Sequence, residues 1–270
     1  MPFYETSGSG NSNFILIHGF GLNRKSWYDL VPMLPGDSVI HLVDLIGFGD
    51  SPAPENWPYT IDAQTEVLFD FIVSRNISDV VLVGHSYGGG VALMLVHKML
   101  ERGNSELIKN LILIAPAAFP QALPFFITLP RIPVIGRAVL AGVSADFQMR
   151  TTLRAIFRNK QAVTEERIRR YVANIKKRSH RNALIQTARN IFPDNMARLM
   201  SEFDKIQHRT LLVYGENDPV ILKRNLERLS RTLTNVITQK IENCGHIPHE
   251  EYPQITAGLI SDFWETCHIK

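Results

Sequence analysis

Residues 79–90, DVVLVGHSYGGG, join a run of apolar residues to a helical pattern through a turn rich in glycine. The four apolar residues 80–83 predict a strand that is buried on both faces, and VALMLVHKML from residue 91 predicts a helix. The turn between them is Gly84-His85-Ser86-Tyr87-Gly88, which matches the G-x-S-x-G pattern of a nucleophile elbow.

The elbow pattern makes two structural demands. Ser86 must take a strained conformation, with φ above zero, so that the chain can turn from strand to helix within so few residues. Gly84 and Gly88 are needed because a Cβ at either position would collide with the neighbouring strand and helix. The helix start behind Ser86 offers unpaired N–H groups and a partial positive charge, which suit an oxyanion. The alternative is a glycine-rich turn with an incidental serine; the position between a strand and a helix favours the elbow.

A single domain, or a domain with one insertion, fits a chain of 270 residues. The hydrophobic content of 45% and charged content of 20% are ordinary for a globular protein. Residues 1–13 show no signal peptide, and no apolar run reaches the roughly 18 residues of a membrane span. The two cysteines, Cys244 and Cys267, give neither a disulfide framework nor metal-ligand spacing. We therefore expect a cytoplasmic protein without an integral membrane segment.

Basic charge is concentrated in one part of the chain. Residues 131–210 contain 17 basic and 6 acidic residues, a balance of +11, and the remainder has a balance of −8. Such a segment could attract an anionic substrate or an anionic membrane surface, although a solvated helix face is the commoner explanation. We expect no nucleic-acid partner, because there is no recognition motif and the basic faces lack interleaved aromatic residues.

Predicted strands alternate with predicted helices over most of the chain. The strands are expected at residues 14–17, 39–45, 80–83, 111–115, 210–214 and 236–241. This rhythm predicts the α/β class, with a mostly parallel central sheet and helices on both faces.

The rhythm breaks after Pro116. A segment rich in proline and bulky apolar residues is followed by three basic helices, expected near residues 144–158, 164–179 and 181–192. We interpret residues 118–195 as an all-helical cap inserted into a core of residues 1–117 and 196–270. Such a cap would lie over the carboxyl ends of the strands, where ligands bind in open α/β sheets.

Four motifs occur in a fixed order along the chain: His18-Gly19-Phe20-Gly21, the elbow at residues 84–88, Gly215-Glu216-Asn217-Asp218-Pro219, and Cys244-Gly245-His246. With them, the chain resembles the α/β-hydrolase superfamily over nearly its whole length. Within that superfamily it is similar to the cap-bearing serine hydrolases, which include carboxylesterases, lipid-ester hydrolases and carbon–carbon bond hydrolases. The predicted cap itself matches nothing specific.

The resemblance implies a catalytic triad of Ser86 as nucleophile, Asp218 as acid and His246 as base. The order Ser, Asp, His along the chain is the one expected for this fold. The strand pattern agrees, because Asp218 and His246 follow two predicted strands and should reach the same edge of the sheet as Ser86. Glu216 and Asp194 are weaker substitutes for Asp218, and His249 is a local rival of His246.

An oxyanion hole needs two preorganised N–H groups. By position, they should be the backbone N–H groups of Phe20 and Tyr87. We interpret His18 as ordering the loop that contains Phe20, and His85 and Cys244 as packing residues.

A serine at the elbow, with a histidine base, suits attack on a carbonyl and an acyl-enzyme intermediate. Hydrolysis of a carboxylic ester is the first hypothesis. A thioester or a carbon–carbon bond of a diketone could be cleaved by the same triad, and the fold also serves as a non-catalytic ligand-binding module. The apolar residues 123–127 and 132–135 could line a site for a small-molecule substrate with an apolar acyl or aromatic group, or they could only seal the cap onto the core. We expect no cofactor and no metal; the sequence predicts neither specific substrate-binding residues nor an oligomeric state.

Overall fold

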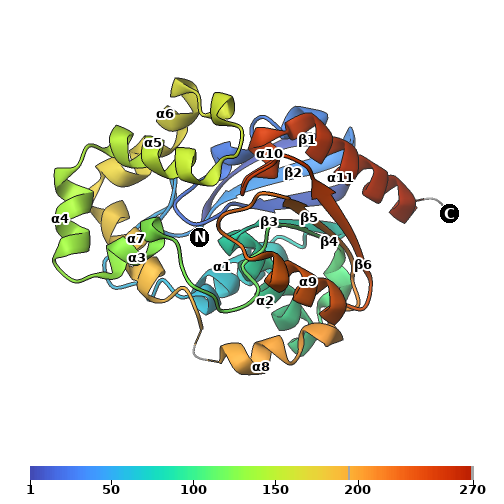
Figure 1. The fold of residues 1–270 in the computed structure, drawn as a ribbon. Coiled ribbons are helices and arrows are strands. Elements are labelled where there is room, and N and C mark those ends of the chain that lie inside the picture. The colour runs from blue at the N-terminus through green and yellow to red at the C-terminus, as the bar shows by residue number, and fades with distance from the viewer. Residues whose placement is uncertain (194, 269–270) are drawn as a thin grey trace.

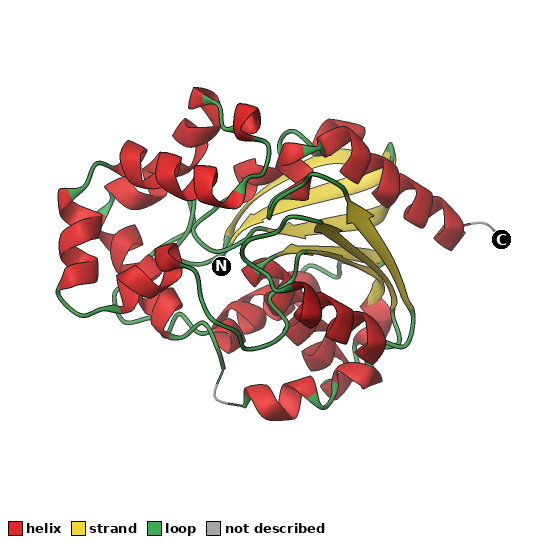
Figure 2. Ribbon diagram, in the orientation of Figure 1, coloured by secondary structure: helices red, strands yellow, loops and turns green. Residues whose placement is uncertain are grey.

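The computed structural model describes residues 1–193 and 195–268, and a six-stranded sheet runs through it between layers of helices (Figures 1 and 2). The strands are β1 (Phe3–Ile17), β2 (Asp37–Asp44), β3 (Val80–His85), β4 (Ile108–Ile114), β5 (Arg209–Gly215) and β6 (Val236–Ile241). Their order across the sheet is β2-β1-β3-β4-β5-β6, and every neighbouring pair from β1 to β6 is parallel. The predicted α/β fold with a mostly parallel sheet is therefore confirmed.

The strand β1 bends back on itself. The β2 partners of residues 3–9 run backwards, from Asp44 towards Asp37, whereas those of residues 12–17 run forwards, from Ser38 to Val43. Gly8 has a φ of +80° close to this reversal, a conformation that glycine adopts without strain. The first half of β1 therefore protects the outer edge of β2, and the second half joins β2 to the parallel part of the sheet.

Helices complete the fold on both faces and at one end of the sheet. They are α1 (Ile61–Ser74), α2 (Tyr87–Glu101), α3 (Phe125–Arg131), α4 (Ile135–Gly142), α5 (Ala145–Ile156), α6 (Glu165–Lys176), α7 (Arg178–Arg189), α8 (Met196–Met200), α9 (Lys223–Thr232), α10 (Pro248–Glu251) and α11 (Pro253–His268). Successive residues of a strand point to opposite faces. Accordingly, Leu82 of β3 packs in the core that includes α1 and α2, whereas Val81 and Val83 pack with α11. Helices thus cover both faces, as predicted.

Helices α3 to α7 follow one another between β4 and β5 and stand together at one end of the molecule (Figure 1). The helices α5, α6 and α7 lie where the basic helical patterns were expected. The structure adds α3 and α4 in the proline-rich segment. Within the described residues no single helix has the length and apolar character to cross a membrane; α3 and α4 have them only when taken together, and they are bent by 116°.

Candidate active site

The elbow adopts the strained geometry that the sequence requires. Ser86 has φ 52° and ψ −117°, between the end of β3 and the start of α2. A Cβ on Gly84 would lie 2.5 Å from the carbonyl oxygen of Gly88, and one on Gly88 would lie 2.4 Å from that of His18. Only glycine fits at these two positions without moving backbone atoms. The Ser86 N–H donates a 3.0 Å hydrogen bond to Ile114 of β4, which fixes the elbow to the sheet.

The side chains of Ser86, His246 and Asp218 lie in one hydrogen-bonded row. His246 Nε2 lies 2.9 Å from Ser86 Oγ, and His246 Nδ1 lies 2.8 Å from Asp218 Oδ2. Because a carboxylate accepts only, Nδ1 carries the proton and Nε2 accepts from the serine hydroxyl. The second carboxylate oxygen of Asp218, Oδ1, accepts the N–H groups of Val220 at 2.7 Å and Ile221 at 3.0 Å. Three hydrogen bonds, two on Oδ1 and one on Oδ2, thereby fix the orientation of the Asp218 carboxylate.

The rival residues lie elsewhere. Glu216 pairs with Lys240 at 2.6 Å on the surface. His249 stacks on Trp27 with ring centroids 4.1 Å apart and is fully buried. Asp194 lies outside the described residues. Cys244 is buried, and its pKa is raised by burial, so its thiol stays protonated.

Two buried histidines support the row from behind. His85 Nε2–H donates to the backbone carbonyl of His246 at 2.9 Å, and burial lowers the pKa of His85 well below its ordinary value. His18 Nδ1–H donates to the Gly19 carbonyl at 2.9 Å, while its Nε2 accepts the Leu45 N–H at 3.1 Å. Burial lowers the pKa of His18 as well. Both rings are therefore neutral, and each holds a loop beside Ser86 through these hydrogen bonds.

Phe20 and Tyr87, the two predicted backbone donors, both lie beside Ser86, where the three residues line a common cavity. Tyr87 is the first residue of α2, so its N–H belongs to the unpaired group at the helix start. This position suits a negative charge that develops on a substrate oxygen next to Ser86.

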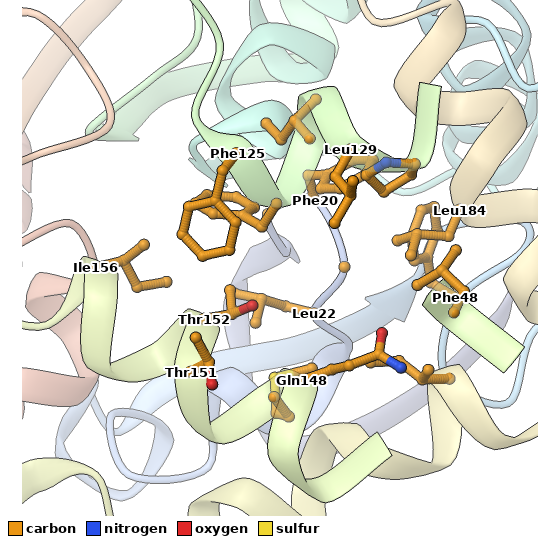
Figure 3. Close-up of a pocket in the computed structure, with 18 of the residues that line it drawn as sticks. Phe20, Leu22, Phe48, Phe125, Leu129, Gln148, Thr151, Thr152, Ile156 and Leu184 are labelled. Atoms are coloured by element: carbon orange, nitrogen blue, oxygen red, sulfur yellow. The ribbon is translucent and has the colours of Figure 1, made fainter. Parts of the chain in front are cut away.

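A cavity of about 230 Å³ opens above Ser86 and His246 (Figure 3). Its walls come from the loops after β1 and β2 and from helices α3, α4, α5 and α7; the labelled side chains in Figure 3 include Phe20, Leu22, Phe48, Phe125, Leu129, Ile156 and Leu184. No Asp, Glu, Lys or Arg is among its lining residues. The cavity therefore suits an uncharged, largely apolar group.

A second, smaller cavity of about 50 Å³ lies on another side of the serine. Phe20, Ser86, Ile127 and Val220 line both cavities. The Ser86 hydroxyl thus lies where the two spaces meet. A substrate whose reacting carbon sits at Ser86 could place a larger group in the first cavity and a smaller one in the second.

The segment after His246 is tied to α5 and α6 by contacts that the sequence did not reveal. The His246 N–H donates to the Ile156 carbonyl at 2.9 Å. Glu251 accepts the N–H groups of Gly245, Arg158 and Asn159, each at 2.9 Å. Two adjacent acidic residues normally indicate an exposed site; their burial here was not visible from the sequence.

Glu250, next to Glu251, is fully buried and faces α6. Its carboxylate lies 2.6 Å from Arg167 Nε and accepts the hydroxyl of Tyr171 at 2.5 Å. Burial nevertheless raises the pKa of Glu250 to about 7, with Arg167 and Tyr171 opposing the shift.

Glu250 should make the folded state less stable as the pH rises from about 5 to about 7. The folded protein keeps a proton on Glu250 that the unfolded chain has already released in this range, so the native state binds more protons and loses stability as pH increases. The displaced pKa corresponds to a loss of up to about 3 kcal/mol in the free energy of unfolding. Denaturant unfolding at several pH values should show this loss in the wild type and its absence in Glu250→Gln.

Glu166→Gln is the matched control, because Glu166 is an exposed carboxylate on the same helix that Glu250 contacts. This variant should retain the wild-type pH dependence. Parallel stability curves for wild type and Glu250→Gln would show that Glu250 titrates in the same range in both states and would refute the assignment.

The described residues contain one group of three side chains close enough to share a metal ion: His97, Glu101 and Glu202. It lies about three turns along α2 from Ser86. Arg198 pairs with Glu101 at 3.0 Å and with Glu202 at 3.4 Å, and Lys205 lies 3.5 Å from Glu202. These cations already neutralise both carboxylates, so we interpret the group as ion pairing that links α2 to the segment before β5.

Comparison with known proteins shows the family to which the chain belongs. A family model described as the alpha/beta hydrolase family matches residues 14–259. The 2-hydroxymuconate semialdehyde hydrolase of Pseudomonas sp. (strain CF600) is 26% identical over 264 residues, covering 95% of this chain and 88% of that protein. The pimeloyl-[acyl-carrier protein] methyl ester esterase of Aeromonas hydrophila is 26% identical over 268 residues, covering 96% and 97%.

Among solved structures, the meta-cleavage product hydrolase CumD of Pseudomonas fluorescens IP01 superposes with a TM-score of 0.80 at 20% identity. The match covers 99% of this chain and 95% of that one. At this identity the likeness establishes the fold.

Proposed function

Because this chain belongs to the alpha/beta hydrolase family and is a hydrolytic enzyme, we propose that it cleaves carboxylic esters through an acyl-enzyme intermediate on Ser86. One observation carries the proposal. The Ser86 hydroxyl is hydrogen-bonded at 2.9 Å to His246, which is held at 2.8 Å by Asp218, at the floor of an apolar cavity. A serine in this setting is activated for attack on a carbonyl carbon.

The reaction proceeds in two halves. His246 Nε2 takes the Ser86 proton as Oγ attacks the ester carbonyl, and the resulting oxyanion is stabilised by the backbone N–H groups of Phe20 and Tyr87. The imidazolium then donates its proton to the leaving alcohol, which leaves an acyl group on Ser86. A water molecule, deprotonated by His246, attacks this acyl group, and the proton returns to Oγ as the acid departs.

The cavities define the substrate class that we propose. The acyl group is apolar, because the larger cavity has no charged lining residue, and it is of moderate size, since about 230 Å³ lies below the roughly 300–1,000 Å³ usual for drug-sized ligands. No Arg or Lys among the described residues lines this cavity to pair with a carboxylate, so binding of a diketone that carries a carboxylate is also disfavoured. Cleavage of a thioester or of a carbon–carbon bond remains the alternative reaction of the same triad. Of the two relatives compared, one is named an esterase and the other a semialdehyde hydrolase.

A panel of activated esters of graded acyl length, assayed beside a thioester and a diketone, tests the proposed reaction. We expect the highest kcat/KM for an ester with an apolar acyl chain. Higher kcat/KM for the diketone would make the protein a carbon–carbon hydrolase, and no turnover of any member would favour the ligand-binding role on this fold.

Narrowing the larger cavity should shift the preference towards shorter acyl chains. Val139 of α4 lines this cavity, so Val139→Phe fills part of it. We expect kcat/KM to fall about 10–100-fold for the longest acyl chain, because overfilling an apolar site costs about 1–3 kcal/mol, and to change little for acetate esters. Ala138→Phe is the control, since Ala138 is exposed on the same helix and does not line the cavity. Equal effects of both variants on all chain lengths would contradict the assignment of the acyl site.

Two further points remain proposals. We propose that residues 118–195 act as a cap on the core of residues 1–117 and 196–270, because α3, α4, α5 and α7 supply much of the cavity wall. We propose a cytoplasmic location, since Cys244 and Cys267 are both free thiols.

A further inference from the structure

Exposed apolar side chains gather on one end of the molecule, on α3, α4 and the start of α5. We call residues 125–147 the cap tip. Val134 is 77% exposed, Phe147 62%, Ile135 52% and Phe125 50%. Residues 131–135, RIPVI, are all exposed in succession. A contiguous apolar surface of this kind marks a contact site for a partner or a membrane.

The cap tip carries two arginines and one acidic residue, the exposed Asp146 at the start of α5. Between residues 125 and 145 the only charged residues are Arg131 and Arg137, and both side chains are exposed. Elsewhere on these helices arginines meet acids, as Arg150 does with Glu165 at 2.5 Å. In the described part of the chain, no ion pair involves Arg131 or Arg137. With two arginines against one aspartate, the cap tip is apolar with a net positive charge, which complements an anionic surface.

The backbone of the cap tip is shaped to lie along a surface. The apolar helices α3 and α4 meet at a bend of 116°, so they do not form one straight span. Gly136 and Leu140 of α4 are buried, whereas Ile135 and Ala138 are exposed. Val134, between the helices, has φ +66°, a strained conformation for a β-branched residue that keeps its side chain outside. An apolar face with basic residues at its border is typical of interfacial helices.

The apolar surface continues into the cavity above Ser86. Phe125, Val143 and Phe147 are exposed and also line the larger cavity. Figure 3 shows Phe125 and Leu129 of α3 at this cavity, beside the loop residue Phe20. An acyl chain could therefore pass from a surface in contact with the cap tip to the serine along a mainly apolar wall.

We propose that the cap tip docks on an anionic lipid bilayer, with Val134 and Ile135 inserted among the acyl chains and Arg131 and Arg137 at the headgroups. A second copy of this chain is a poorer occupant. In a twofold contact the same patch meets itself, which would bring unpaired arginines together. Docking would bring ester lipids of the membrane to Ser86 as its substrates. This claim about the substrate rests on the proposed function, whereas the claim about docking does not.

Flotation of the full-length protein with vesicles tests the docking. The vesicles are phosphatidylcholine alone, or phosphatidylcholine mixed with an equal amount of phosphatidylglycerol. We expect binding to the mixed vesicles that weakens with salt. The double variant Arg131→Gln/Arg137→Gln should bind them about 25-fold more weakly, since each arginine contributes about fivefold. The double variant Val134→Asp/Ile135→Asp should abolish binding to the mixed vesicles.

Ile255→Asp is the matched control, because Ile255 is also 50% exposed but lies on α11. It should bind vesicles as the wild type does. None of the substituted positions lines a cavity, so every variant should hydrolyse a soluble ester at the wild-type rate, which also shows that it is folded.

The outcomes separate the two claims. Vesicle binding without hydrolysis of any ester would refute the proposed function and keep the docking. Ester hydrolysis without vesicle binding, or equal binding by the cap-tip variants and Ile255→Asp, would overturn the docking alone. A dimer in sedimentation that Val134→Asp/Ile135→Asp dissociates, together with no binding to vesicles, would assign the cap tip to a second copy and overturn it as well.

Discussion

Replacing Ser86 by alanine should lower kcat by about 10⁴–10⁶-fold, the loss measured when a triad nucleophile is removed. In the proposed reaction the Ser86 hydroxyl, hydrogen-bonded to His246, forms the acyl-enzyme, so its loss removes both halves of the reaction. The fold should survive, because alanine is smaller and requires no new backbone conformation. Substrate binding should survive for the same reason, since the apolar cavity walls are unchanged.

Steady-state kinetics on the best ester of the panel give the size of this effect. Ser78→Ala is the matched control, because Ser78 is an exposed serine just before β3, at the opposite end of the strand from the elbow. It should retain full activity. Turnover of Ser86→Ala within tenfold of the wild type would exclude Ser86 as the nucleophile.

Asp218→Asn should lower kcat by about 10⁴-fold, although it changes the size of the side chain very little. Asp218 Oδ1 is held by the N–H groups of Val220 and Ile221, which would keep the amide oxygen of asparagine on that side. The amide NH₂ would then face His246 Nδ1 and donate to it. This arrangement forces the proton onto His246 Nε2, so that the ring can no longer accept the proton of Ser86.

Glu216→Gln is the control for this variant, because Glu216 is a surface carboxylate two residues earlier that pairs with Lys240. It should leave kcat unchanged. The tautomer itself can be read from the ¹⁵N shifts of the His246 ring, which should differ between wild type and Asp218→Asn. Unchanged ring shifts together with wild-type activity would mean that Asp218 does not orient the imidazole.

The elements around the elbow could be predicted because short-range physics determines them. Residues 80–83 are continuously apolar, as a strand covered on both faces must be, and Gly84 and Gly88 occupy positions where a Cβ has no room. The meeting of Asp218 and His246 at one edge follows from the parallel topology, whereas the order of the strands in the sheet is known only from the structure.

Other features depend on contacts between distant residues and were not predictable. The helices α3 and α4 are short and apolar, and Pro130 and Pro133 hide their pattern, so the sequence showed only a proline-rich segment. The four-residue helix α10 is too short to show a period. From the sequence, Glu250 is expected on the surface. Its burial depends on Arg167 and Tyr171, which contact it although they lie far away in the sequence.

These distant contacts bear on the reaction. The backbone of His246 is bound to Ile156, and Glu251 binds the N–H groups of Gly245 and of the residues that follow α5. The loop that carries His246 is therefore fixed to the same helix that lines the larger cavity. A movement of α5 would displace both the wall of the cavity and the histidine.

The central claim is that Ser86 is the nucleophile. Mass spectrometry of the protein after reaction with a serine-reactive phosphonate ester tests it most directly. We predict one phosphonyl adduct per chain, on the peptide that contains Ser86, and no adduct on folded Ser86→Ala. An adduct on another residue, or none on the folded wild-type protein, would contradict the account.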